Sequence, residues 1–137
     1  MQNKEINTFI QGNEPYQVQI SAFSAGHDLV VIVSGGEKPH VGAVAISIPR
    51  PSLSNPEIVS SSTSVFALVG HKEDDLAKAM AGKIAASLNK KVVLTAGIHV
   101  ENISADGIKL IQDNCENALE QLIKSYAFFI KEGVDGR

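Results

Sequence analysis

Three histidines stand at junctions between the elements predicted for this chain, and imidazole is suited to acid–base or metal chemistry near neutral pH. His40 follows a pair of glycines, His71 stands between a predicted strand and a predicted helix, and His99 lies at the end of the last predicted strand. If the strands that carry His40 and His99 are neighbours, the three imidazoles converge with Lys72 at one edge of a sheet.

Three interpretations of this cluster stay open. The histidines could bind zinc in an open, catalytic-type arrangement, although they lack a local ligand spacing such as HExxH. Residues 70–72 could bind a phosphate or carboxylate through the backbone N–H groups of a helix start and Lys72, although the acidic residues 73–75 repel an anion. In the third interpretation, which is the commonest for isolated histidines, they bond to the backbone and fill turns.

Sequence motifs of the major enzyme classes are missing from the chain. It contains no GxSxG, GxxxxGK[ST], GxGxxG or CxxC pattern. Asp74 and Asp75 are consecutive in a predicted helix and point about 100° apart, which suits a paired-carboxylate site poorly. The single cysteine, Cys115, lies on the apolar stripe of a helix, which predicts a buried structural thiol. The sequence gives no strong support for enzyme activity.

Length and composition indicate one globular domain spanning residues 1–137. The net charge of −3 argues against a nucleic-acid-binding protein, and Lys90 and Lys91 are the only adjacent basic pair. The N-terminal residues lack the apolar stretch of a secretion signal, and no run of about 18 apolar residues predicts a membrane span. We therefore expect a cytoplasmic protein that contacts neither nucleic acid nor membrane.

The first half of the chain reads as β-strands. Alternating or continuous apolar residues predict them at 6–10, 16–23, 28–35, 41–48 and 64–70. Because the segment 41–48 carries Gly42 and small alanines, we expect a helix or another chain to pack closely there. Residues 49–64 hold prolines and many serines, which predicts a mobile loop.

The second half alternates helix and strand. Leu76, Met80, Ile84 and Leu88 recur every four residues and predict a helix after Gly70, and residues 90–102 return to a strand. Ser104 is a suitable N-cap for the last helix. The apolar stripe of that helix consists of Ile108, Ile111, Cys115, Leu119, Leu122 and Tyr126.

The element order β-β-β-β-β-α-β-α predicts an α+β fold. We expect a mainly antiparallel sheet of five to six strands with two helices packed on one face. The strand at 28–35 is apolar on both sides, and residues 126–130 are apolar around most of the helix. Since one small chain has too few elements to cover both surfaces, a homodimer is expected to bury the second one.

Three segments of the sequence resemble a known family. They are KPHVGAVAIS (38–47), GHKEDDLAKAMAGKIA (70–85) and VVLTAGIHVENISADGI (92–108). These blocks resemble the small accessory D subunits of gallate- and hydroxybenzoate-type decarboxylases, which are described as prenylated-flavin chaperone-like proteins. The domain is also similar in architecture to the small proteasome-assembly chaperones, which are dimeric α+β proteins.

The resemblance implies a function without catalysis. A large decarboxylase subunit uses prenylated FMN, and the small protein assists cofactor delivery, maturation or subunit assembly, binding prenylated FMN or FMN, or the large subunit. The alternatives are a small histidine-based or metal-dependent enzyme and a purely structural interaction module. The positions in the matching blocks that are expected to bind ligand are His40, Gly42, His71, Lys72, Asp74, Gly97, His99 and Asn102.

Overall fold

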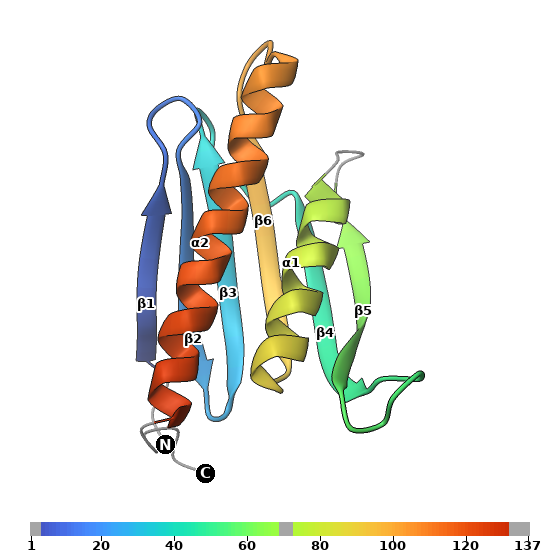
Figure 1. Cartoon of the computed structure of the whole chain (residues 1–137). Helices are drawn as coiled ribbons and strands as arrows, with labels where there is room; N and C mark the ends of the chain where they lie inside the picture. The colour runs from blue at the N-terminus through green and yellow to red at the C-terminus, as the bar shows by residue number, and fades with distance from the viewer. Residues whose placement is uncertain (1–3, 69–72, 132–137) are drawn as a thin grey trace.

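The structure, a computed structural model, describes residues 4–68 and 73–131, with the side chains of residues 7–68 and 73–126. The elements follow the predicted order (Figure 1). The strands are β1 (Lys4–Gln11), β2 (Val18–Ala25), β3 (Asp28–Gly36), β4 (Ala43–Pro51), β5 (Val59–Ala67) and β6 (Val92–His99). The helices are α1 (Glu73–Leu88) and α2 (Ala105–Lys131).

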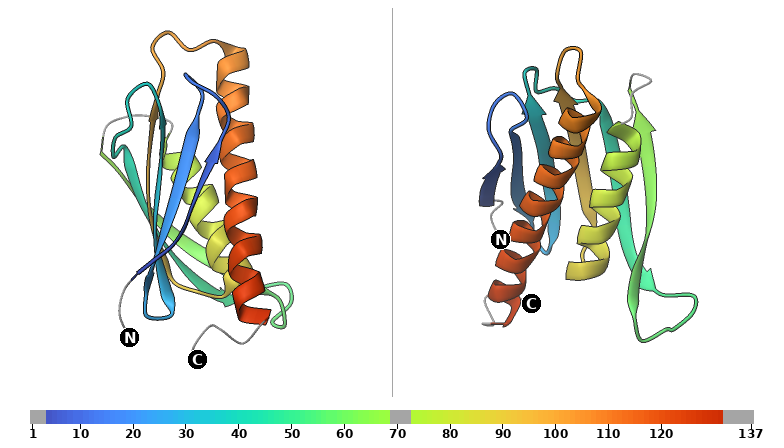
Figure 2. Two further views of the ribbon diagram at one scale, coloured as in Figure 1. Left: turned by 90° about the vertical axis from the view of Figure 1, so that its left-hand side faces the viewer. Right: turned by 45° about the horizontal axis from the view of Figure 1, so that its top comes forward.

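The six strands form one mixed sheet in the order β1-β2-β3-β6-β4-β5. Neighbouring strands run antiparallel except for β3 and β6, which are parallel over Leu29–Gly36 and Val92–His99. Both helices lie on the same face of the sheet (Figures 1 and 2). The predicted α+β fold, with a mainly antiparallel sheet and two helices on one face, is therefore confirmed.

Helix α1 packs on the small residues of β4. Ala43 and Ala45 are completely buried, as are three alanines on the facing side of the helix, Ala77, Ala81 and Ala85. Because alanine adds only a methyl group to the backbone, such a seam lets the helix approach the strand closely. The bulky neighbour expected beside 41–48 is therefore a helix of the same chain.

Helix α2 buries only part of its predicted stripe. Cys115, Leu119, Leu122 and Tyr126 are buried, whereas Ile108 remains 40% exposed. The first turns of α2 extend beyond the end of β6, so the sheet does not cover them (Figure 1). Burial raises the pKa of the Cys115 thiol to about 12, so the thiol stays protonated near neutral pH, as expected of a structural cysteine.

The turn between α1 and β6 is fixed by a buried lysine. The Lys90 side chain is only 2% exposed, and its ammonium group lies 5.0 Å from the centre of the Tyr126 ring. This distance permits a cation–π interaction that connects the turn to the end of α2. The basic pair noted in the sequence therefore does not form a basic surface patch.

The loop expected at 49–64 is shorter than predicted. Residues 49–51 continue β4 and residues 59–64 begin β5, with Ile48 opposite Ser62 and Pro51 opposite Val59. The prediction was wrong in extent because serine and threonine can pair in an edge strand that buries few side chains, and proline is tolerated beside an edge. Only residues 52–58 separate the two strands.

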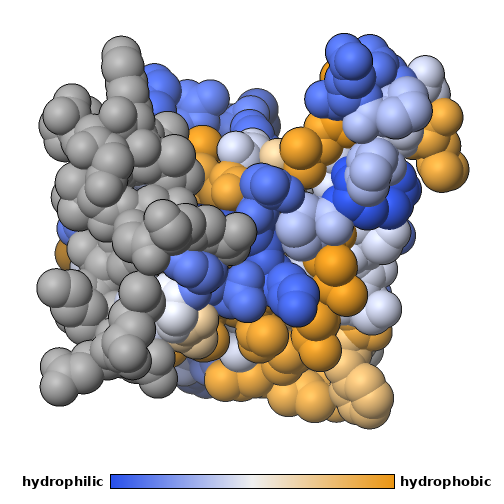
Figure 3. Space-filling model, turned by 90° about the horizontal axis from the view of Figure 1, so that it is seen from below, coloured by the Kyte–Doolittle hydropathy of each residue, from blue (hydrophilic) through white to orange (hydrophobic). Residues whose placement is uncertain are grey.

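The sheet face away from the helices is apolar and uncovered by the described residues. Alternate residues of each strand point to this open face. Hydrophobic side chains gather along the lower margin of Figure 3, which is this side of the sheet. Five hydrophobic side chains that point to the open face are between 38% and 73% exposed: Val30, Ile32, Ile46, Ile48 and Phe66.

Neither α1 nor α2 is both long enough and apolar enough to cross a bilayer.

Replacing the N-cap of α2 tests the predicted helix start. The Gly107 N–H donates a hydrogen bond to Ser104 Oγ at 3.0 Å. Ser104→Ala removes this acceptor and is expected to lower the free energy of unfolding by about 1 kcal/mol. Urea denaturation followed by circular dichroism measures the change. Ser54→Ala, in the exposed 52–58 loop, is the control, and an equal effect of the two substitutions would contradict the capping role.

Candidate functional site

The loop between β3 and β4 lies against the end of β6 and places His40 there. The N–H groups of Glu37 and Lys38 both donate to the carbonyl of His99, at 2.7 and 3.2 Å. Farther along the loop, the His40 N–H donates to the carbonyl of Gly97 at 3.4 Å. Strands β4 and β6 are neighbours, and His40 lies in the loop directly before β4.

Glycine at position 97 permits this close approach. A Cβ atom at Gly97 would overlap the backbone carbonyl of His40. Gly36, the last residue of β3 before the loop, has φ +73°, and a Cβ atom there would lie against the carbonyl of His99. The loop can therefore lie directly on the β6 backbone only because two glycines leave room for it.

Glu73, the first residue of α1, joins the loop, the strand and the helix. Its Oε1 atom lies 2.9 Å from His40 Nε2 and accepts a hydrogen bond from the Ile98 N–H at 3.3 Å. The carboxylate covers Gly42, where any Cβ would collide with it. Glu73 is only 9% exposed, and no donor among the described residues reaches its buried Oε2 atom. One carboxylate oxygen thus retains hydrogen-bonding capacity.

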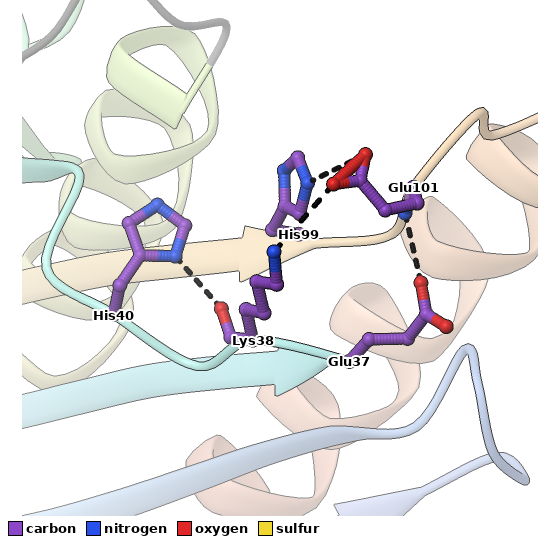
Figure 4. Close-up of polar contacts among 5 residues, drawn as sticks. All are labelled: Glu37, Lys38, His40, His99 and Glu101. Carbon is purple, nitrogen blue, oxygen red and sulfur yellow. Dashed lines mark hydrogen bonds and ion pairs between the residues drawn. The ribbon is translucent and has the colours of Figure 1, made fainter.

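A second polar group surrounds Glu101 (Figure 4). Its carboxylate lies 3.5 Å from Lys38 Nζ and 3.6 Å from His99 Nε2, and its N–H donates to Glu37 Oε1 at 2.8 Å. Lys38 and Glu101 are 67% and 60% exposed, so their ion pair is worth less than about 1 kcal/mol. These contacts position the side chains of Lys38, His99 and Glu101 at the rim of the site and contribute little to the stability of the fold.

The two described histidines of the predicted cluster pair with different carboxylates. His40 pairs with Glu73, whereas His99 pairs with Glu101. His71 and Lys72, the other members of the predicted cluster, lie outside the described residues. Among the residues that are described, no three histidine, cysteine, aspartate or glutamate side chains gather in a way that could hold a metal ion.

A cavity of about 540 Å³ opens beside this site, between the first turns of α1 and α2 and the end of β6. Six of its ten lining residues are aliphatic, and its polar residues include Glu73 and His99. The full lining consists of Glu73, Asp75, Leu76, Ile98, His99, Val100, Ile103, Ile108, Ile111 and Gln112. The part of the α2 stripe that the sheet leaves uncovered therefore forms a wall of this pocket.

The remaining predicted residues lie nearby in exposed or partly exposed positions. Asp74 accepts a hydrogen bond from the Asp75 N–H at 2.9 Å, and Asn102 occupies a turn with φ +50°. Sequence reasoning missed Glu73 as the carboxylate that connects the site, because residues 73–75 were considered only as an acidic run that repels an anion. A signal was present in Gly42, whose missing side chain makes room for this carboxylate.

Comparisons with known proteins identify relatives of this chain. The family model of the prenylated flavin chaperone LpdD-like domain matches residues 12–127. Protein LpdD of Lactiplantibacillus plantarum is 30% identical over 118 residues, which cover 85% of this chain and 82% of that protein.

The fold also has a counterpart among solved structures. A chain in the crystal structure of a chaperone complex for yeast 20S proteasome assembly superposes with a TM-score of 0.59. The match covers 92% of this chain and 99% of that chain at 16% identity. This likeness shows a shared fold and confirms the architecture expected from the sequence.

Adding a methyl group at position 97 tests the close contact between the β3–β4 loop and β6. Gly97→Ala is expected to lower the free energy of unfolding by about 2 kcal/mol or more, because backbone must move to relieve the overlap. Gly82→Ala is the control, since its Cβ would meet only the hydroxyl groups of Ser61 and Thr63 at 3.3 Å. The control is expected to change stability by less than about 1 kcal/mol. Equal denaturation midpoints for the two variants would refute this account.

Proposed function

Because this chain belongs to the prenylated flavin chaperone LpdD-like family, we propose that it is a non-catalytic accessory protein of a prenylated-FMN-dependent decarboxylase. It holds the cofactor and delivers it to the large subunit that performs the chemistry. The family match over residues 12–127 is the observation on which this proposal rests. Maturation of the bound cofactor and assembly of the subunits are related tasks of the same complex.

The pocket between α1 and α2 supports a cofactor-handling function. Its volume of about 540 Å³ lies within the range of about 300–1,000 Å³ typical of small-molecule sites. Aliphatic walls, such as Ile98 and Ile111, can cover a flat ring and exclude water from it. Bound prenylated FMN would supply the decarboxylation chemistry in the large subunit, whereas this chain supplies binding and shielding.

The residues predicted to bind ligand take different parts in this proposal. His99 lines the pocket, where it can contact the ligand directly. His40, Gly42 and Gly97 act indirectly, because they hold or make room for the loop and the Glu73 carboxylate. Ligand contacts by Asp74 and Asn102 stay predictions, as do those of the two residues outside the described part.

We further propose that the protein acts as a homodimer formed through the open face of the sheet. Val30, Ile32, Ile46 and Ile48 lie on this face at alternating positions of β3 and β4 and are 38% to 51% exposed. Two sheets pack face to face through such side chains, with about 10 Å between them. Pairing of this kind would remove the exposed apolar surface from water.

The charge pattern of the open face favours a second copy of the same chain as its partner. From residues 30 to 34 of β3, 93 to 95 of β6 and 44 to 48 of β4, the outward positions carry only valine, isoleucine, serine or threonine. In a two-fold interface, the same surface of each copy packs against the other. A charged side chain there would therefore lie close to the same charge of the second copy. This uncharged strip can pack against the same strip of a second copy without electrostatic repulsion.

Cofactor transfer is the direct test of the accessory function. After incubation with prenylated FMN and removal of free cofactor, the protein is expected to keep a flavin mass in native mass spectrometry. On mixing with cofactor-free decarboxylase, that mass should move to the large subunit. Serum albumin carried through the same steps is the control. Retention of a metal ion in place of flavin, or no gain over albumin, would contradict the proposal.

Charge on the open face tests the dimer. The wild-type protein is expected to be a dimer by light scattering at micromolar concentration. Ile46→Glu buries an unpaired carboxylate in each copy and is expected to raise the dissociation constant about 100-fold or more. Leu53→Glu, at a loop position that is 92% exposed, is the matched control and should leave the dimer intact. A monomeric wild-type protein would exclude the dimer.

A further inference from the structure

The pocket between α1 and α2 has an aliphatic wall. Its side chains come from α1, from the end of β6 with the connection after it, and from the first turns of α2: Leu76, Ile98, Val100, Ile103, Ile108 and Ile111. None of these six side chains is fully buried, so each of them exposes apolar surface. A ligand that covers this surface with hydrocarbon is stabilised by the hydrophobic effect.

The aliphatic wall is held in place by the structure behind it. Leu76, Ile98 and Ile111 pack against the hydrophobic core. Ile103 lies against the first turn of α2, where Gly107 leaves room for it, since a Cβ atom at Gly107 would approach Ile103 Cγ1 to 2.9 Å. Because these side chains are already ordered, a ligand loses little binding free energy in fixing them.

The aliphatic wall offers no aromatic side chain for stacking on a flavin ring. None of the ten described residues that line the cavity is phenylalanine, tyrosine or tryptophan. The sequence of residues 69–72, which precede Glu73, contains none of these residue types either. Stacking on a flat ring is the particular contribution of aromatic side chains, whereas branched aliphatic side chains gain dispersion contacts with any hydrocarbon that fits between them. The pocket is therefore better suited to an aliphatic part of a ligand than to a flat ring alone.

We propose that the aliphatic wall binds the prenyl-derived part of the cofactor and thereby distinguishes prenylated FMN from FMN. The inference deepens the proposed function and rests on it. A prenyl group adds five carbon atoms in a branched arrangement to the flavin. Each methyl or methylene group that becomes buried strengthens binding about fourfold. Burial of only two of the five carbon atoms would then give a preference of about 15-fold.

Comparing the two flavins gives the first test. The purified full-length protein is titrated anaerobically with prenylated FMN and, separately, with FMN, and isothermal titration calorimetry measures each dissociation constant. The dissociation constant for prenylated FMN is expected to be at least about tenfold lower than that for FMN. Because both ligands carry the same phosphate and ribityl chain, the ratio reports the contribution of the added hydrocarbon.

Shortening one side chain of the aliphatic wall locates the site. Ile108→Ala removes three carbon atoms and is expected to lower the preference for prenylated FMN about fivefold, while the affinity for FMN changes less than about twofold. Leu110→Ala is the matched control, because Leu110 is similarly exposed, at 46% against 40%, and does not line the cavity. This control is expected to keep the wild-type preference. Thermal unfolding of each variant checks that it is folded.

The outcomes separate the inference from the proposed function. Equal affinity of the wild-type protein for the two flavins overturns the inference and leaves the accessory function standing. The same conclusion follows if Ile108→Ala weakens both flavins equally, or if it keeps the wild-type preference as Leu110→Ala does. If the wild-type protein binds neither flavin, both the inference and cofactor handling fail. A preference for prenylated FMN that falls in Ile108→Ala and persists in Leu110→Ala supports the inference.

Discussion

The entry of β6 between β3 and β4 is the constraint on which the rest of the structure depends. This strand pairs in parallel with β3 over eight positions and antiparallel with β4 over five. Its backbone also accepts the N–H groups of the β3–β4 loop, which places His40 beside α1. The two helices cover the face around this central strand, and the pocket opens where β6 ends.

Local sequence patterns predict most of the helices and strands, but they do not predict the order of the strands in the sheet. The four-residue spacing of Met80, Ile84 and Leu88 identified α1, and these residues are buried. Strand order could not be read from the chain, because pairing between β3 and β6 joins residues more than 60 positions apart. The serines of residues 59–64 show no apolar period, so the sequence predicts a loop where the structure has the start of β5. Glu73 was missed because its contacts arise only after β6 is in place.

The open sheet face and the pocket lie on different sides of the molecule. The first belongs to the side without helices, and the second lies among the ends of α1, α2 and β6 (Figure 2). In a dimer formed through the open face, both pockets would point outward. Each copy could then receive or release a ligand without separating from the other, as the proposed cofactor delivery would require.

The alanine seam between α1 and β4 also limits which substitutions this chain can accept in its core. Ala45 on the strand and Ala81 on the helix are both fully buried, so neither position offers space for a larger side chain. A substitution on one element must be accompanied by a compensating change on the other or by a shift of the helix. Since α1 begins with Glu73, such a shift would move the carboxylate away from His40. Packing in this part of the core is therefore coupled to the position of the Glu73 carboxylate.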